Sequence, residues 1–146
     1  MKKEDIDILV KSGVLRIKQP DMEKIKSLIK SAEINSRVAL NFPLTEDSAT
    51  LVFRELYESI RQLGEARWLI LGYEPQKAHH EISLEILKDI SIKEKIKFNY
   101  LDRFKKIRHD ANYSGFRVSV SQAREIIDFW NKCGKEVMDI LKKLLK

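Results

Sequence analysis

Apolar residues recur along most of the chain at steps of three and four, the spacing that places them on one side of an α-helix. Only five glycines and three prolines are present, and they fall between these apolar stripes. The pattern therefore predicts an all-α protein. Its four main helices are expected at residues 20–41, 45–71, 92 to about 111, and from about 120 to the C-terminus, with a shorter helix at 76–89. Ile96 and Leu144 are among the apolar positions expected to face inward.

The ends of these segments carry residues that commonly start or stop a helix. Pro20 suits a first turn, Thr45 is the expected N-cap of the second helix, and Gly72 ends that helix. Ser119 and Gln122 have the spacing of a capping box before the last helix. Because the loop between the first two helices is short, they should pair antiparallel. The sum is an up-and-down four-helix bundle with short accessory helices.

The first residues leave two alternatives open. The apolar positions from 4 to 18 suit a short helix followed by a turn at Gly13, or an extended arm over residues 14–17. We expect residues 1–19 to form a short helix and an arm packed on the bundle. Since neither a repeat nor a linker is visible, residues 1–146 should make a single domain.

The amino-acid composition limits the class of protein and the cellular compartment that can be expected. The chain is 34% charged and 43% apolar, which is typical of a globular protein. Its N-terminus lacks the apolar run of a signal peptide, and no run approaches the ~20 residues that cross a bilayer. The single Cys133 lies in an apolar stripe and has no partner for a disulfide, so we expect a buried, reduced thiol. These features predict a cytoplasmic protein without a membrane association. The net charge of +6 is compatible with nucleic-acid binding but does not require it.

The densest polar chemistry lies in RFKKIRHDANYSG, residues 103–115, near the end of a predicted helix. It contains Arg103, Lys105, Lys106, Arg108, His109, Asn112 and Tyr113. Arginine and lysine gather phosphate, and a histidine can take and return a proton near neutral pH. These are the groups that metal-free RNA cleavage requires, a cation over the phosphate and a base for the 2′-hydroxyl. The alternative is a solvated basic face whose arginines pair with Asp102, Asp110 or a neighbouring helix.

Other polar and aromatic residues favour structural roles. His79 and His80 would point about 100° apart on a helix, which predicts a polar helix start or surface rather than a metal pair. Trp68 and Trp130 lie beside apolar stripes and are expected in packing or a dimer interface. The sequence has no glycine-rich phosphate loop, zinc-type cysteine cluster or paired-carboxylate motif, so we expect no metal and no cofactor.

Two stretches resemble a known family. ALNFPLTEDSATLVFRELYESIRQLGEARWLILGYEP is similar to the long second helix of prokaryotic HEPN proteins (higher eukaryotes and prokaryotes nucleotide-binding domains). KIRHDANYSG followed by SVSQAREIIDFW resembles the arginine, alanine-aspartate-tyrosine and following-helix pattern of one HEPN branch. The resemblance covers about residues 21–146. It implies a helical bundle that often forms a homodimer, RNA or a nucleotide as ligand, and a separate nucleotidyltransferase partner of the toxin–antitoxin kind.

Many HEPN proteins carry an arginine followed four to six residues later by a histidine, and two registers compete here. Arg103 and His109 have five residues between them, which fits that spacing. In the stronger form of the motif, asparagine, aspartate or histidine directly follows the arginine. His109 after Arg108 agrees with this, but Tyr113 then stands where the final histidine would fall. Arg103 and His109 would also lie about 120° apart on an unbroken helix, so a site shared across a two-fold dimer axis is one hypothesis.

Three functions remain open from the sequence. The favoured one is an RNA- or nucleotide-binding protein of the HEPN type that works with a nucleotidyltransferase partner. The second is an active metal-independent endoribonuclease, in which Arg103 or Arg108 holds the phosphate and His109 moves the proton. The third is a non-catalytic interaction module. In the first two, the residues expected to contact phosphate or nucleic acid are Lys105, Lys106, Asn112 and Tyr113.

Overall fold

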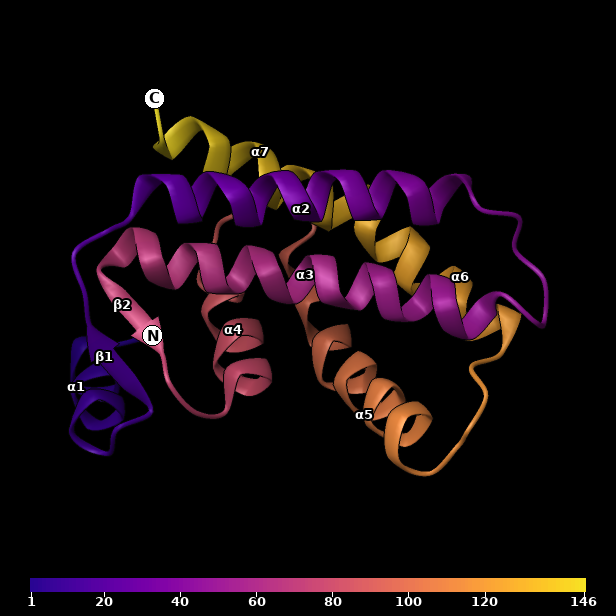
Figure 1. Ribbon diagram of the computed structural model, residues 1–146, viewed down its shortest axis with the longest axis horizontal. Coiled ribbons are helices and arrows are strands. Elements are labelled where there is room, and N and C mark those ends of the chain that lie inside the picture. Colours follow the sequence, from indigo (N-terminus) through magenta and orange to yellow (C-terminus); the bar gives the residue numbers. More distant parts are fainter.

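The computed structural model describes residues 1–146, which fold mainly into α-helices, as the sequence predicts (Figure 1). The two longest, α2 (Met22–Asn41) and α3 (Ala49–Leu71), lie antiparallel and side by side. Helices α6 (Val120–Phe129) and α7 (Lys135–Leu144) cover one side of this pair, while α4 (His79–Leu87) and α5 (Tyr100–Tyr113) pack on the other side of α3. None of the helices combines the length and the apolar composition that a membrane crossing requires.

The turn between α2 and α3 departs slightly from the predicted one. The helix α3 begins at Ala49, because Thr45 and Ser48 first close a turn of their own. The Thr45 backbone N–H donates to Ser48 Oγ (2.8 Å), and the Ser48 N–H donates to Thr45 Oγ1 (3.2 Å). At its other end α3 stops at Gly72 as predicted, in the left-handed conformation that favours glycine (φ +95°).

The helix predicted from residue 92 starts later than expected. Residues 95–99 form a 3₁₀-helix, η1 (Lys95–Asn99), and α5 follows from Tyr100. Ile96, expected to point inward, is 78% exposed. Just before this segment a tertiary contact is made: the Glu136 carboxylate of α7 accepts hydrogen bonds from the Lys93 backbone N–H at 3.2 and 3.3 Å. Local periodicity carries no information about such a contact.

The last helical segment contains a wide turn. Its start has the predicted capping box of Ser119 and Gln122. From there α6 continues through the π-helical turn η2 (Trp130–Gly134) into α7. Trp130 and Cys133 are fully buried, which confirms packing roles for both, and burial raises the pKa of the Cys133 thiol to about 11. Leu144, expected to face inward, is 52% exposed.

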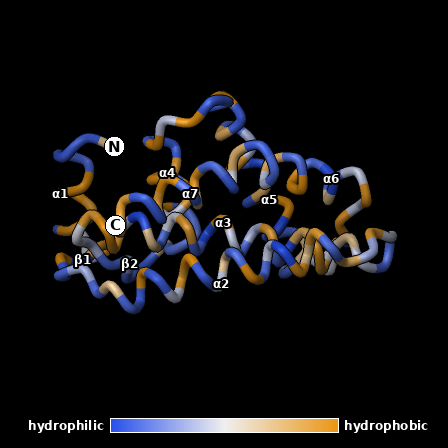
Figure 2. Tube along the Cα trace, turned by 90° about the horizontal axis from the view of Figure 1, so that it is seen from above, coloured by the Kyte–Doolittle hydropathy of each residue, from blue (hydrophilic) through white to orange (hydrophobic).

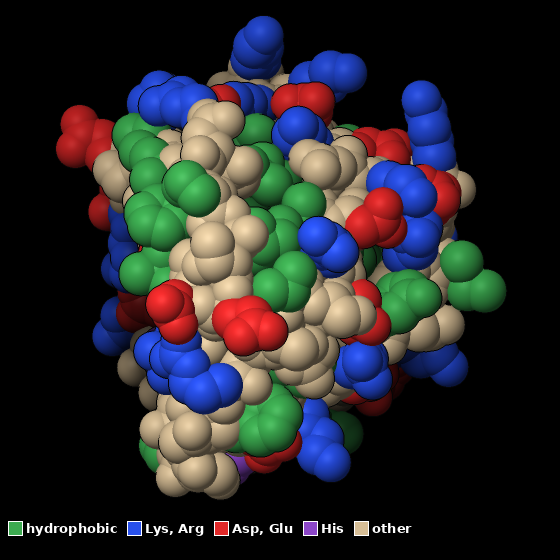
Figure 3. Space-filling model, turned by 90° about the vertical axis from the view of Figure 1, so that its right-hand side faces the viewer, with side chains coloured by type: hydrophobic (Ala, Val, Ile, Leu, Met, Phe, Trp, Pro, Cys, Tyr) green, Lys and Arg blue, Asp and Glu red, His purple; other side chains and the backbone are tan.

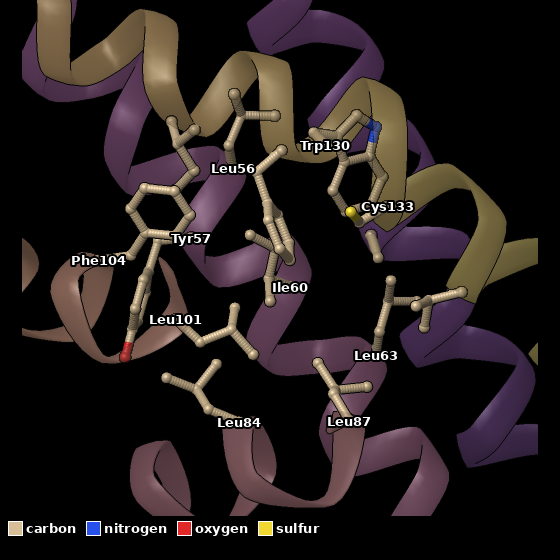
Figure 4. Close-up of a cluster of buried hydrophobic side chains, with 14 of the residues drawn as sticks. Leu56, Tyr57, Ile60, Leu63, Leu84, Leu87, Leu101, Phe104, Trp130 and Cys133 are labelled. Carbon is tan, nitrogen blue, oxygen red and sulfur yellow. The ribbon is translucent and has the colours of Figure 1, made fainter. Parts of the chain in front are cut away.

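The main core follows α3, which contacts every other long helix. Along the trace, apolar and polar residues alternate at the spacing of helical turns (Figure 2). Figure 4 shows Leu56, Ile60 and Leu63 of α3 pointing toward side chains from both sides. The Phe104 ring of α5 meets the rings of Phe53 and Phe129 edge to face, with centroids 5.9 and 5.5 Å apart. This contact fixes which side of α5 faces the core.

The N-terminal residues contain both structures that the sequence left open. The helix α1 (Lys3–Lys11) is followed by a turn at Gly13 (φ +78°) and a strand, β1 (Leu15–Ile17). This strand pairs antiparallel with β2 (Tyr73–Pro75), which the sequence did not predict. A small second core of Leu15, Trp68, Ile82 and Ile86 lies beneath this two-stranded β1–β2 ribbon.

Candidate functional site

The position of α4 is set by one side of α3. Tyr57, Gly64 and Trp68 are separated by seven and four residues, so they share a face of the helix. Trp68 Nε1 donates a hydrogen bond to the Ile82 carbonyl at 2.9 Å. Gly64 allows the α4 backbone to approach closely, since a Cβ there would lie 2.0 Å from the Ser83 carbonyl oxygen. These contacts hold the first turn of α4 over the Tyr57 ring.

The orientation of α5 follows from its apolar side. Its buried residues are Leu101, Phe104, Ile107 and Ala111. At the C-terminal end of the helix, Arg54 of α3 donates to the Ala111 carbonyl at 3.3 Å. Polar side chains between these buried positions must therefore point away from the core, partly toward α4 and partly toward α6.

A cleft of about 630 Å³ lies between α5 and the first turn of α4, with Tyr57 of α3 at its floor. Five residues expected from the sequence to contact the ligand line it together: Lys105, Lys106, Arg108, His109 and Tyr113. The remaining lining residues are Tyr57, Ala78, His79, His80, Glu81 and Asp110. The sequence stretch is thus concentrated into one concave surface by the packing of α5 against α4.

Arg103 and Asn112 do not line the cleft. Arg103 points to α6, where its Nε and Nη2 donate to the two Glu125 carboxylate oxygens at 2.9 and 3.2 Å. For this arginine, the structure agrees with the alternative of pairing to a neighbouring helix. Arg103 and His109 therefore face different ways within one chain, as their six-residue separation predicted. Asn112 is exposed beyond the cleft.

The charged side chains of the cleft are not paired with one another. None of Lys105, Lys106, Arg108, Glu81 or Asp110 forms an ion pair. The Arg108 guanidinium lies over the Tyr57 ring, 5.7 Å from its centroid. Cations outnumber carboxylates by three to two among the lining residues. Their N–H groups are available to an anion from outside the chain.

Two further histidines belong to this cleft, and the sequence analysis missed them. His79 and His80 start α4, as expected, but they line the cleft beside His109. The His80 ring stacks on Tyr57, with centroids 5.7 Å apart and planes 23° apart. Burial lowers the pKa of His80 below its ordinary 6.5, and the nearby charge of Arg108 lowers it further. No local signal marks these residues, because the contact joins helices far apart along the chain.

The floor of the cleft holds polar atoms without partners. Tyr57 is 1% exposed, and its hydroxyl has no hydrogen-bond partner. Burial raises the pKa of this phenol to about 12, against the opposing effect of Arg108. His80 Nδ1 is likewise buried and unpartnered. Beside them Ala78 adopts a left-handed backbone (φ +51°), which a residue with a Cβ takes up only with strain.

Beyond the cleft, an apolar surface lies at the end of the molecule that carries the α2–α3 turn. Val38, Phe42, Leu51 and Phe116 are between 47% and 58% exposed there. Figure 3 shows hydrophobic side chains gathered on this end, with charged residues around them. Scattered apolar residues are ordinary on a protein surface, but a gathered group is typical of a face that another molecule covers.

No three histidine, cysteine or carboxylate side chains come close enough together to hold a metal ion. Comparison of the chain with protein-family models, with curated proteins and with solved structures gives no match.

Proposed function

We propose that this chain is a HEPN-type RNA- or nucleotide-binding protein, a HEPN-like up-and-down bundle whose ligand occupies the cleft between α4 and α5. One observation carries the proposal: Lys105, Lys106 and Arg108 line one cleft without ion pairs, next to three histidines. Arginine binds phosphate through two parallel hydrogen bonds and lysine binds it as a point charge. A phosphate-bearing ligand supplies the ionic partner that Glu81 and Asp110, although they line the same cleft, do not.

The test is the salt dependence of RNA affinity. A fluorescein-labelled single-stranded RNA is titrated with wild-type protein and with the triple variant Lys105→Gln, Lys106→Gln, Arg108→Gln, and anisotropy is followed from 50 to 300 mM KCl. The slope of log affinity against log salt should shrink by about 2 in the triple variant, because each phosphate contact on a single strand contributes roughly 0.7. Affinity at ~0.1 M salt should fall at least tenfold.

Arg103→Gln is the matched control, since Arg103 lies on the same helix but pairs with Glu125 outside the cleft. It should bind RNA like the wild type. An equal loss of RNA affinity in the control and in the triple variant would place the RNA on the general basic surface of α5. Unchanged affinity in the triple variant would remove the cleft from the proposal.

A metal-independent endoribonuclease is a second candidate, which the histidines of the cleft favour. Arg108 would hold the scissile phosphate and His109 would move the proton from the 2′-hydroxyl. A mixed RNA pool incubated in EDTA should be cut by the wild type and left intact by His109→Ala and Arg108→Ala, with cyclic phosphate ends on the products. Intact RNA with the wild type would leave binding without cleavage.

The proposal includes a homodimer and a nucleotidyltransferase-domain partner of the toxin–antitoxin kind. The exposed apolar end with Val38, Phe42 and Phe116 supports the homodimer, because covering apolar side chains with a second surface lowers the free energy. Light scattering of purified protein measures the mass, and Phe42→Asp should convert a dimer to a monomer. A wild-type monomer at all concentrations would contradict it. Co-purification with the candidate partner tests the second part.

A further inference from the structure

The floor of the cleft differs chemically from its rim. At the rim stand Lys105, Lys106 and Arg108, all charged and unpaired. At the floor lie the Tyr57 hydroxyl and His80 Nδ1, both buried and both without a hydrogen-bond partner. Buried polar atoms are nearly always paired, and leaving one unpaired carries a large desolvation penalty. Of the six buried side-chain atoms without a partner, these two lie together in the cleft, where a bound ligand could pair with both.

The burial of the floor favours the uncharged forms of both its side chains. Burial keeps the Tyr57 phenol protonated, so its hydroxyl can both donate and accept. Burial lowers the pKa of His80, which favours its uncharged form, and the uncharged ring offers one donor and one acceptor nitrogen. The two rings are stacked, and Figure 4 shows the Tyr57 oxygen at the outer end of its ring, directed away from the core. A neutral group with adjacent donors and acceptors suits this floor, while a second anion does not.

From the charged rim and the buried floor we propose that the cleft binds a single nucleotide unit, with its phosphate on the rim and its nucleobase at the floor. This inference rests on the proposed function above. The nucleobase edge exchanges hydrogen bonds with the Tyr57 hydroxyl and His80 Nδ1. A volume of about 630 Å³ lies within the usual range for a small-molecule site. The strained Ala78 backbone, at the start of α4, marks the segment that must shift for the nucleobase to reach the floor.

The experiment compares ligands that share the phosphate but differ in the nucleobase. Isothermal titration calorimetry measures the affinities of ribose 5-phosphate and of AMP, GMP, CMP and UMP for the wild-type protein. At least one nucleotide should bind about tenfold more tightly than ribose 5-phosphate, because only the nucleobase reaches the unpaired floor atoms. This comparison needs no variant and so is independent of any folding defect.

Tyr57→Phe then removes one oxygen and leaves the buried ring in place. It should weaken the preferred nucleotide roughly tenfold and leave ribose 5-phosphate unchanged. Tyr100→Phe is the control, because Tyr100 lies on α5 outside this cleft. The triple rim variant should weaken all five ligands together.

The outcomes separate the two proposals. Equal affinity for ribose 5-phosphate and every nucleotide, or a Tyr57→Phe variant that binds the nucleotides like the wild type, would overturn the nucleobase floor and leave the phosphate rim standing. RNA binding without any mononucleotide binding would have the same consequence. Absence of binding to RNA and to every small ligand would overturn both.

Discussion

Two groups of three cations occur in this protein, and they are used in opposite ways. Arg16, Lys18 and Lys24 all contact the Glu74 carboxylate, at 2.5, 2.8 and 3.3 Å. The Glu74 side chain is only 12% exposed, and its hydrogen bonds, that from Lys18 first, lower its pKa to about 2. This group is complete within the chain. It ties the β1–β2 ribbon to the start of α2.

The three cations of the cleft have no such carboxylate. Lys105, Lys106 and Arg108 lie in one concave surface with Glu81 and Asp110, yet no ion pair joins any of them. The number of cations is therefore a poor guide to function, because it is equal in the two groups. What distinguishes them is whether a carboxylate of the chain forms ion pairs with the cations. A group of cations without such pairs is available to an external anion.

The largest expected effect concerns the wall of the cleft. Gly64→Ala should lower the free energy of unfolding by about 3 kcal/mol, since the new Cβ would lie 2.0 Å from the Ser83 carbonyl and the α4 backbone must move. Gly72→Ala, at the ribbon, meets no atom closer than 3.8 Å but has φ +95°, so about 1–2 kcal/mol is expected. Urea unfolding measures both. A smaller loss for Gly64→Ala than for Gly72→Ala would contradict this packing.

Next in size is the effect of removing the counter-charge from the ribbon group. Glu74→Gln should lower the free energy of unfolding at pH 7 by about 2 kcal/mol. A pKa lowered to about 2 corresponds to roughly 3 kcal/mol before solvent screening of the partly exposed cations is considered. Glu81→Gln, which removes an unpaired carboxylate of the cleft, is the control and should change the value by less than about 0.5 kcal/mol.

The same variant has a defined pH dependence. Because the folded-state pKa of Glu74 lies below its ordinary 4.5, its contribution is fully present above that pH and disappears as the pH falls toward 2. The difference in unfolding free energy between wild type and Glu74→Gln should therefore shrink over this interval. A difference that stays constant from pH 5 to pH 2 would show that Glu74 acts through packing rather than charge.

A smaller effect is expected when charge is removed from the cleft. Lys105→Gln with Lys106→Gln should leave the free energy of unfolding within about 0.5 kcal/mol of the wild type, and raise it if anything, because two like charges without partners are removed. Urea unfolding at low and high salt measures this. A loss comparable to that of Glu74→Gln would mean that these lysines have structural partners.

The smallest effect is on the titration of one histidine. NMR titration of the ring protons should place the pKa of His80 below 6.5, and Arg108→Gln should raise it, because the guanidinium disfavours the charged imidazolium. Arg103→Gln should leave it unchanged, since Arg103 pairs with Glu125. A pKa of His80 that does not respond to Arg108→Gln would place the two groups farther apart than the structure has them.

The sequence predicted most of the helices, but it did not predict features that depend on contacts between residues far apart along the chain. The capping box at Ser119, the stop at Gly72 and the buried side of α5 were readable, because each depends on residues within one or two turns. The β1–β2 ribbon was not predicted, because Leu15 pairs with Pro75 and the whole of α2 and α3 lies between them in the sequence. Ile96, expected to face inward, is exposed on a 3₁₀-helix that follows Lys93, whose backbone N–H bonds to Glu136 far along the chain.

For the candidate site, the sequence determined which chemical groups are present, and the tertiary structure decided which of them are paired and which line the cleft. Periodicity already separated Arg103 from His109, and the cations near Tyr113 were evident as a charge cluster. Only packing revealed that Arg103 is held by Glu125, and that His80 and Tyr57 complete the cleft. The physical reason is range: helical spacing is set by neighbours along the chain, whereas burial and counter-charge depend on residues that meet only after folding.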